Sequence, residues 1–151
     1  MTDQLTEEAD VMTNDVRITT KIALVVRADL QDWQKLNLTA FLASGVAASA
    51  PDAIGRDYAD ADGTRYTPMF GEPVMVYAAD PAKLTRTLNR ALSRDVVATV
   101  FTMELFGTPH DAANRAAVAA HPRDSLDLAG LAVRADRKTV DKIVDGLRLH
   151  P

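Results

Sequence analysis

The sequence predicts a layered α/β domain in which helices cover both faces of a four-stranded, mostly parallel or mixed sheet, giving three layers. Apolar runs of strand length lie at 22–26, 74–78, 96–103 and 126–133. Each run is followed by a segment whose apolar residues recur at helical spacing. Strands that alternate with helices along a chain favour a sheet that is buried on both faces.

The first run, Ile22–Val26, contains no polar residue and ends at Arg27. Such a continuous apolar run is typical of a strand covered on both faces. We expect a turn over 28–31. The carboxylate of Asp32 or Asp29 is then expected to cap the next helix.

That helix is expected from Trp33 to about Ala50, because no helix breaker occurs before Pro51. Its apolar residues follow two sides, with Leu36, Ala40, Ala43 and Ala47 on one and Leu38, Phe41, Leu42 and Val46 on the other. A helix that is apolar on two sides must pack against a partner on each of them. One packing partner is the sheet. The other is a second layer, the following loop or a partner subunit. The last of these alternatives predicts a homodimer.

Residues 52–73 form an irregular insertion between the first two strand–helix units. An Asp-Gly pair ending at Gly63 lies between Tyr58 and Tyr66, which is typical of a hairpin turn. The acids from Asp60 onward lack the register and the final glutamate of a calcium-binding loop. We therefore interpret this segment as a turn.

Three further helix starts are marked by a capping residue. Asp80 precedes Pro81, Thr108 precedes Pro109, and Asp136 precedes the last helix. In each case we expect the side-chain oxygen to accept a hydrogen bond from the first turn of the helix.

The length of 151 residues suggests one domain, which we place at 19–151 after a flexible acidic tail at 1–18. The chain has no cysteine, so disulfides, thiol nucleophiles and zinc–thiolate sites are excluded, which fits a cytoplasmic location. No segment reaches the ~20 apolar residues of a membrane span, so we expect no membrane partner.

The net charge of −4 is concentrated at one end of the chain. Residues 1–15 hold five acids and no base, so the 17 bases of the remainder stand against 16 acids. A nucleic-acid partner usually requires a clear basic excess. The near-neutral body therefore gives such a partner only weak support.

Polar residues follow the first and third strands, at the ends where ligands bind in open α/β sheets. They are Arg27 and Asp29 after the first strand, and Thr102 and Glu104 after the third. If the two strands are neighbours, these side chains share one cleft, bordered by Lys35 and Asn37 of the next helix. The alternative is that Arg27 forms a structural ion pair with Asp29 or Glu104.

Of the three histidines, only His110 lies at an expected helix start beside this cleft. Its imidazole is a candidate general base. His121 and His150 are expected at the surface. The chain has no paired histidines at metal spacing, no Gly-rich phosphate loop and no nucleophile elbow, so we expect no metal and no cofactor.

Two stretches resemble the type II peptidyl-tRNA hydrolases of archaea and eukaryotes. Lys21–Leu30 with Lys35 resembles their opening strand and helix, and Val140–Leu149 resembles their closing helix. Residues 19–149 are also similar to the uncharacterised bacterial DUF2000 family, in Asp60–Gly63, Asn37, Phe101–Met103 and Asn114–Arg115. This second resemblance implies the peptidyl-tRNA hydrolase II fold and no established activity.

The resemblance to the hydrolases also implies site residues. Lys35 corresponds, with a shift of one residue, to a lysine early in their first helix. Glu104 and Thr108 keep the spacing of an acid and a hydroxyl that follow their third strand. A glutamine and a histidine of their first helix are replaced here by Thr39 and by Leu42 or Ala43.

We therefore expect a non-canonical member of this fold that acts as a ligand-binding or protein-interaction module. Its ligand, a small molecule or peptide, would contact Arg27, Asp29, Asn37 and Thr102. A flat apolar surface, with Arg27 paired to Asp29, would favour this interpretation.

The alternative is a hydrolase that acts on an ester or amide, so whether the chain is an enzyme stays open. In that case Lys35 and Glu104 would polarise water, and His110 or Thr108 would assist. A closed pocket with convergent polar groups would favour the hydrolase.

Overall fold

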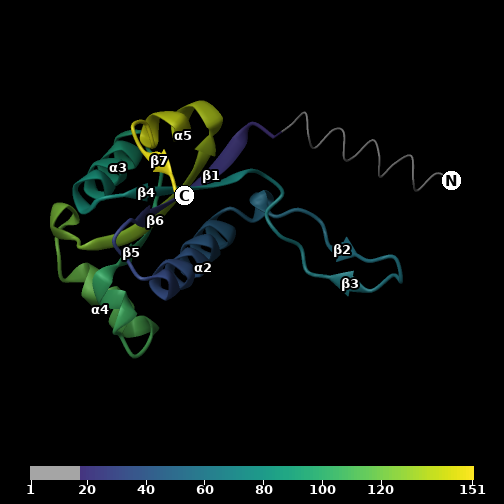
Figure 1. The fold of residues 1–151 in the computed structure, drawn as a ribbon, viewed down its shortest axis with the longest axis horizontal. Coiled ribbons are helices and arrows are strands. Elements are labelled where there is room, and N and C mark those ends of the chain that lie inside the picture. The colour runs from purple at the N-terminus through teal and green to yellow at the C-terminus, as the bar shows by residue number, and fades with distance from the viewer. Residues whose placement is uncertain (1–17) are drawn as a thin grey trace.

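A computed structural model describes residues 18–151 of the chain. The predicted acidic tail at 1–18 therefore lies outside the described residues, apart from Ile18. Figure 1 shows a mixed α/β body from which one long loop segment projects. Within the described residues, no helix is both long and apolar enough to cross a membrane.

The body is built on a five-stranded mixed sheet in the order β5-β6-β1-β4-β7. The strands are β1 (Thr20–Arg27), β4 (Val74–Ala79), β5 (Thr99–Thr102), β6 (Leu128–Asp136) and β7 (Arg148–Leu149). β1 is parallel to β4 and antiparallel to β6, while β5 and β7 are antiparallel to their neighbours.

The prediction of four strands is therefore wrong, since the sheet has five. Of the two predicted arrangements, mostly parallel or mixed, the mixed one is confirmed. In the described chain, β1 and β4 form the only parallel pair of this sheet. They are joined by a crossover that contains a helix, as parallel strands require. β7 was missed because its two residues are exposed and so carry no apolar pattern.

The described residues contain four α-helices: α2 (Asp32–Ser49), α3 (Pro81–Ser93), α4 (Asp111–Ala119) and α5 (Arg137–Ile143). α2, α3 and α5 pack on the sheet, whereas α4 packs against the turn at 103–106 that follows β5. The side chains of β1 alternate between two apolar cores. Ala23 and Val25 contact the core that holds α3 and α5. Leu24 and Val26 contact the core under α2. β1 is thus buried on both faces, as its continuous apolar run predicts.

The predicted caps of two helices are confirmed. Asp80 Oδ1 accepts from the Lys83 backbone N–H at 2.8 Å, at the start of α3. Asp136 Oδ1 accepts from the Thr139 backbone N–H at 3.0 Å, at the start of α5.

The predicted caps of the other two helices are wrong. α2 is capped at Gln31, whose backbone N–H donates to Gln34 Oε1 at 3.0 Å, and Asp32 is already helical. α4 is capped by His110, whose Nδ1 accepts from the Ala113 backbone N–H at 3.1 Å. Thr108 cannot serve there, because its hydroxyl lies against the Leu105 carbonyl at 3.2 Å.

The insertion after α2 contains the predicted hairpin. β2 (Tyr58–Ala59) pairs antiparallel with β3 (Arg65–Tyr66). Gly63 has a φ of 83° in the turn, a conformation that favours glycine. Short 3₁₀ turns complete the fold: η1 (Pro51–Ala53), η2 (Met103–Phe106) and η3 (Arg123–Ser125).

Candidate functional site

A groove of about 440 Å³ opens between the start of α2 and the β4–β7 edge of the sheet. Its lining combines three apolar residues, one threonine and three residues that carry a charge or an imidazole. It consists of Val26, Asp32, Lys35, Leu36, Thr39, Val76 and His150. The volume lies in the usual range for small-molecule sites.

The sheet and α2 place these side chains together. Val26 ends the apolar run of β1, and Val76 lies on β4, so the two parallel strands form the apolar floor. Lys35 lies in the first turns of α2, directly after the β1–α2 turn.

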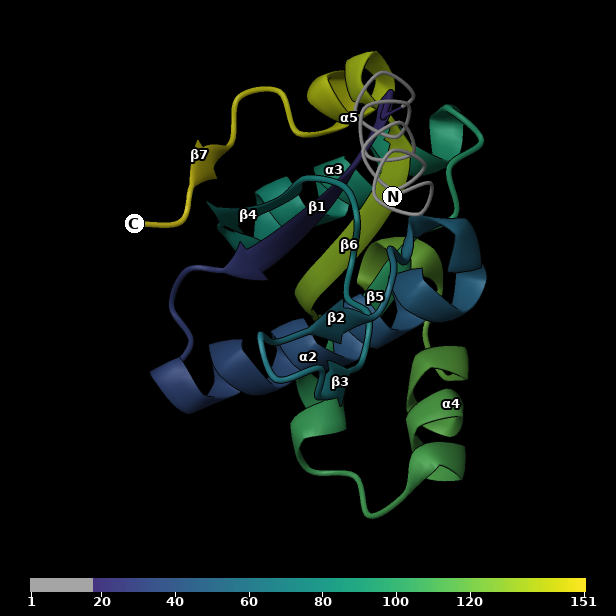
Figure 2. The ribbon, with the colours of Figure 1, turned by 90° about the vertical axis from the view of Figure 1, so that its right-hand side faces the viewer.

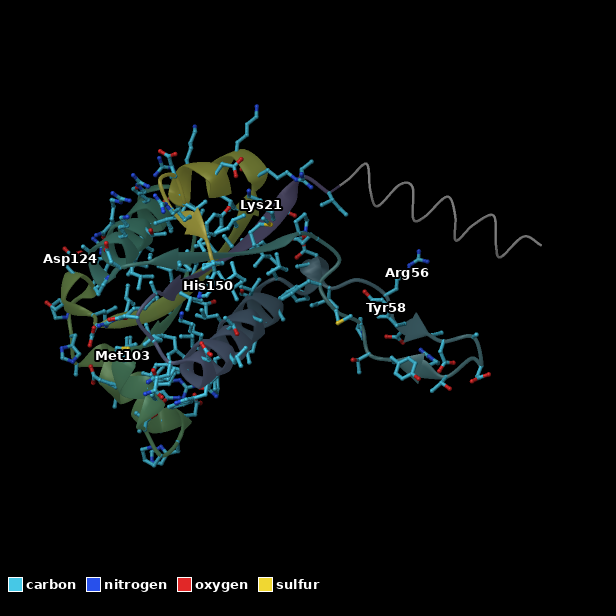
Figure 3. The ribbon with its side chains drawn as sticks, in the orientation of Figure 1. Lys21, Arg56, Tyr58, Met103, Asp124 and His150 are labelled. Atoms are coloured by element: carbon cyan, nitrogen blue, oxygen red, sulfur yellow. The ribbon has the colours of Figure 1, made fainter. Side chains whose placement is uncertain are left out.

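β7 supplies the remaining wall. Its residues pair with Tyr77 and Ala78 of β4. The His150 backbone N–H then donates to the Val76 carbonyl at 2.9 Å. Figure 3 labels His150, which follows the edge strand β7. His150 is half-buried, and its ring lines the groove, a role that the sequence analysis did not assign to it.

Lys35 and His150 meet in this groove. Lys35 Nζ lies 3.1 Å from His150 Nε2, and His150 Nδ1 lies 3.0 Å from the Pro151 main-chain oxygen. A carbonyl oxygen only accepts, so Nδ1 carries the proton and Nε2 is free to accept from the ammonium group. Lys35 therefore has a neutral hydrogen-bond partner and forms no salt bridge within the described residues, although its charge contributes to the lowered pKa of Asp29.

Arg27 does not enter the groove but forms a structural ion pair. Its Nε lies 2.7 Å from Asp29 Oδ1, and its Nη1 lies 3.0 Å from Asp127 Oδ1. The hydrogen bond from Arg27 lowers the pKa of Asp29 below its ordinary value, and the bond to Asp29 raises the pKa of Arg27. The two groups hold the turn after β1, so the alternative prediction of a structural ion pair between Arg27 and Asp29 is confirmed.

β1 and β5 are not neighbours, so the condition on which the shared cleft was predicted is not met. β6 lies between the two strands, and the partner of Arg27 comes from the loop before β6. Three strand spacings of about 4.8 Å separate β5 from β4. Glu104, at the β5 edge, is paired with His121 at 3.1 Å, away from Lys35.

The other predicted site residues are also scattered. Thr108 contacts Asn114, and His110 caps α4. Asn37 is exposed on α2. The Thr102 hydroxyl is buried without a hydrogen-bond partner in the described chain. Of the proposed catalytic set, only Lys35 lies in the groove.

A metal site is not evident in the described part of the chain. Between residues 18 and 151, no group of three or more His, Asp or Glu side chains is placed to hold a metal ion. The groove instead offers a cation, an imidazole and an apolar floor. These groups suit an organic anion better than a metal ion.

Comparison with known proteins shows the family of this chain. Residues 20–151 match the family model described as "Protein of unknown function (DUF2000)". The chain belongs to the DUF2000 family. No curated protein matches it.

The DUF2000 fold is also present in a solved structure. The chain is similar to a protein of unknown function, Atu0240, from Agrobacterium tumefaciens strain C58, with 44% sequence identity and a TM-score of 0.86. The match covers 89% of this chain and 99% of that one. Neither description names an activity, so the function of this DUF2000 protein has to be inferred from its site.

Proposed function

We propose that this DUF2000 protein is a ligand-binding module whose groove takes an apolar small molecule with one carboxylate. The observation that supports it is the pairing of Lys35 with a neutral imidazole. The ammonium keeps its positive charge and two further N–H donors, which a carboxylate accepts as charge-assisted hydrogen bonds. Val26 and Val76 supply the apolar floor for the rest of the ligand.

Asp32 narrows the class of ligand. Its carboxylate lines the same groove as Lys35. A second anionic group on the ligand would approach Asp32 and be repelled. The groove therefore suits monocarboxylates better than dicarboxylates or phosphates.

Binding of a matched series of ligands tests the proposal. We expect octanoate to bind more tightly than octanol or octylammonium in calorimetric titration at constant salt. Lys35→Met keeps an apolar stem but removes the charge, and should weaken octanoate binding about tenfold, the size of one charge-assisted hydrogen bond. Lys138→Met, at an exposed position on α5, is the control. Equal binding of all three ligands, or no effect of Lys35→Met, would contradict the proposal.

The alternative proposal is a hydrolase that acts on an ester or amide. It is favoured by the position of Lys35 next to an imidazole whose tautomer is fixed by a main-chain oxygen, since such pairs support acid–base chemistry. Cleavage of peptidyl-tRNA and of a nitrophenyl ester should then be lost in both Lys35→Ala and His150→Ala. Wild-type protein without either activity would remove this alternative.

Three finer expectations remain proposals. The peptidyl-tRNA hydrolase II fold is supported by the β1–α2 junction with Lys35, and superposition on a solved type II hydrolase tests it. A cytoplasmic location is supported by the absence of cysteine. Nucleic-acid binding predicts an affinity that falls steeply with salt, and its absence at low salt would exclude it.

A further inference from the structure

The outer face of α2 is apolar and exposed. Leu38, Leu42 and Val46 are buried against the sheet, but the opposite side is not covered by any described segment. Leu36 on that side is 72% exposed. Trp33 and Phe41 are also exposed, although the Trp33 ring makes an edge contact with Phe106 and the Phe41 ring makes a tilted contact with Phe101.

The same helix is depleted of charge. No residue from 36 to 50 is charged, which is unusual for a helix that faces water. Depletion of charged residues with enrichment of aromatic ones is typical of the core of a protein–protein interface. The sequence predicts that a second layer, the following loop or a partner subunit packs on this side of α2. No segment of the described chain does so.

The hairpin insertion is a second exposed feature, on which Tyr58, Tyr66 and Met69 are exposed among five charged residues. We call residues 55–71 the arm. Every residue from 55 to 67 is exposed, and Met69 is 60% exposed. Figure 3 shows Arg56 and Tyr58 on this arm, well away from the body. A two-stranded hairpin without a packing surface is marginally stable in water, so the arm is expected to find such a surface on another molecule.

The arm is anchored at its root. The Gly55 N–H donates to the Met69 carbonyl, and the Gly71 N–H to the Ala53 carbonyl, both at 2.8 Å. Arg134 of β6 joins both flanks, with Nε 2.7 Å from Glu72 Oε1 and Nη2 3.2 Å from Asp52 Oδ2.

The tip of the arm is also ordered by its own hydrogen bonds. Asp60 Oδ1 accepts from the Asp62 and Thr64 backbone N–H groups, and Oδ2 accepts from the Tyr66 hydroxyl at 2.7 Å. The arm is therefore held out in a defined direction rather than spread over many, which lowers the entropy cost of docking it.

We propose that these two features form one homodimer interface, in which a second copy of this chain packs its α2 against α2 and each arm reaches over the other copy. Figures 1 and 2 show that the arm projects on the side of the sheet that carries α2. A two-fold axis near Ala40 would place the α2 face and the arm of both copies in the interface. Because such an isologous contact uses the same surface on both copies, assembly stops at the dimer.

The available area fits a stable dimer. Six large apolar side chains are exposed on these two features: Trp33, Leu36, Phe41, Tyr58, Tyr66 and Met69. At roughly 100 Å² of exposed surface each, the twelve side chains of a pair contribute on the order of 1,200 Å², which reaches the size of specific interfaces. The lack of charge along α2 means that two copies do not repel each other there.

Sedimentation equilibrium tests the proposal directly. Wild-type protein should be a dimer at micromolar concentration. Ala40→Arg on α2 and Met69→Asp on the arm should each raise the dimer dissociation constant by at least about tenfold. Ser93→Arg, exposed on α3 at the other face of the sheet, should leave it unchanged. Far-UV circular dichroism reports whether each variant is folded. Because Met69 lies on the arm, outside the body, its substitution should leave the body folded.

Crosslinking provides a second readout. Because the chain has no cysteine, a single Ala40→Cys variant places one thiol per copy beside the expected axis. A short bismaleimide should join two copies through Ala40→Cys but not through Ser93→Cys. A monomeric wild-type protein would overturn the proposal and assign the exposed face of α2 to a different partner. A Met69→Asp variant that dimerises like the wild type would also overturn it.

Discussion

Lys35 Nζ and His150 Nε2 lie 3.1 Å apart although 115 positions separate the two residues in the chain. The contact depends on β7, which pairs with β4 and brings His150 to the wall of the groove. His150 Nε2 accepts one N–H of the Lys35 ammonium group. The two remaining N–H groups are then available to a ligand in the groove.

His150→Ala should therefore weaken carboxylate binding while leaving Lys35 in place. We expect a loss of about 1 kcal/mol, or roughly fivefold in affinity for octanoate, since one neutral hydrogen bond that orients the lysine is removed. Calorimetric titration measures it. His121→Ala removes an imidazole paired with Glu104 and serves as the control. An equal loss in both variants would show that the groove is not the binding site.

Gly130→Ala should destabilise the fold, because a Cβ at residue 130 would lie 2.7 Å from Leu38 Cδ1 and 2.9 Å from the Val25 carbonyl oxygen. Overpacking of this kind costs about 1–3 kcal/mol, and the main-chain contact cannot relax easily. Urea unfolding measures the change. Gly107→Ala is the matched control, since its nearest such contact is 3.8 Å. Equal stability of the two variants would contradict the packing of α2 on β6.

The pair of Arg134 and Glu72 should be the most sensitive ion pair at the root of the arm. The Glu72 side chain is only 6% exposed. Arg134→Met leaves its carboxylate buried without a cation, which should cost about 3 kcal/mol in the free energy of unfolding. A double variant with Glu72→Gln should recover part of this loss, as a coupled pair does. Arg123→Met, at an exposed position, is the control, and strictly additive losses would contradict the coupling.

Protonation of Asp136 should lower the stability of the folded chain at acidic pH. Hydrogen bonds from Thr139 lower the pKa of Asp136 below its ordinary value of 3.8, so the folded chain binds this proton more weakly than the unfolded chain. The stabilisation is present above that ordinary value and is lost as pH falls through the lower pKa of the folded state. Asp136→Asn keeps a capping oxygen but cannot titrate, so its urea midpoint should fall less steeply between pH 5 and 2. Asp145→Asn should follow the wild type.

The parts of the fold that sequence predicts are those set by local chemistry. The apolar run of β1 predicts a strand covered on both faces, because each of its residues meets a core. Asp80 and Asp136 predict helix starts, because a carboxylate before a helix has donors within reach.

The parts that were missed depend on contacts that are distant in sequence. His110 replaces Thr108 as a cap because the Thr108 hydroxyl is occupied by Leu105 and Asn114, which no local rule reveals. The order of strands separates Glu104 from Lys35, and that order follows from pairing rather than from composition. His150 enters the site only through a two-residue strand.

The closed root of the arm has a consequence for how this family can diversify. Main-chain bonds between the two flanks and the clamp from Arg134 complete the body before the arm begins. Changes in length or sequence between 56 and 68 thus leave the cores under α2 and α3 untouched. A change in this segment can therefore alter what the arm binds without altering the sheet or the groove that contains Lys35.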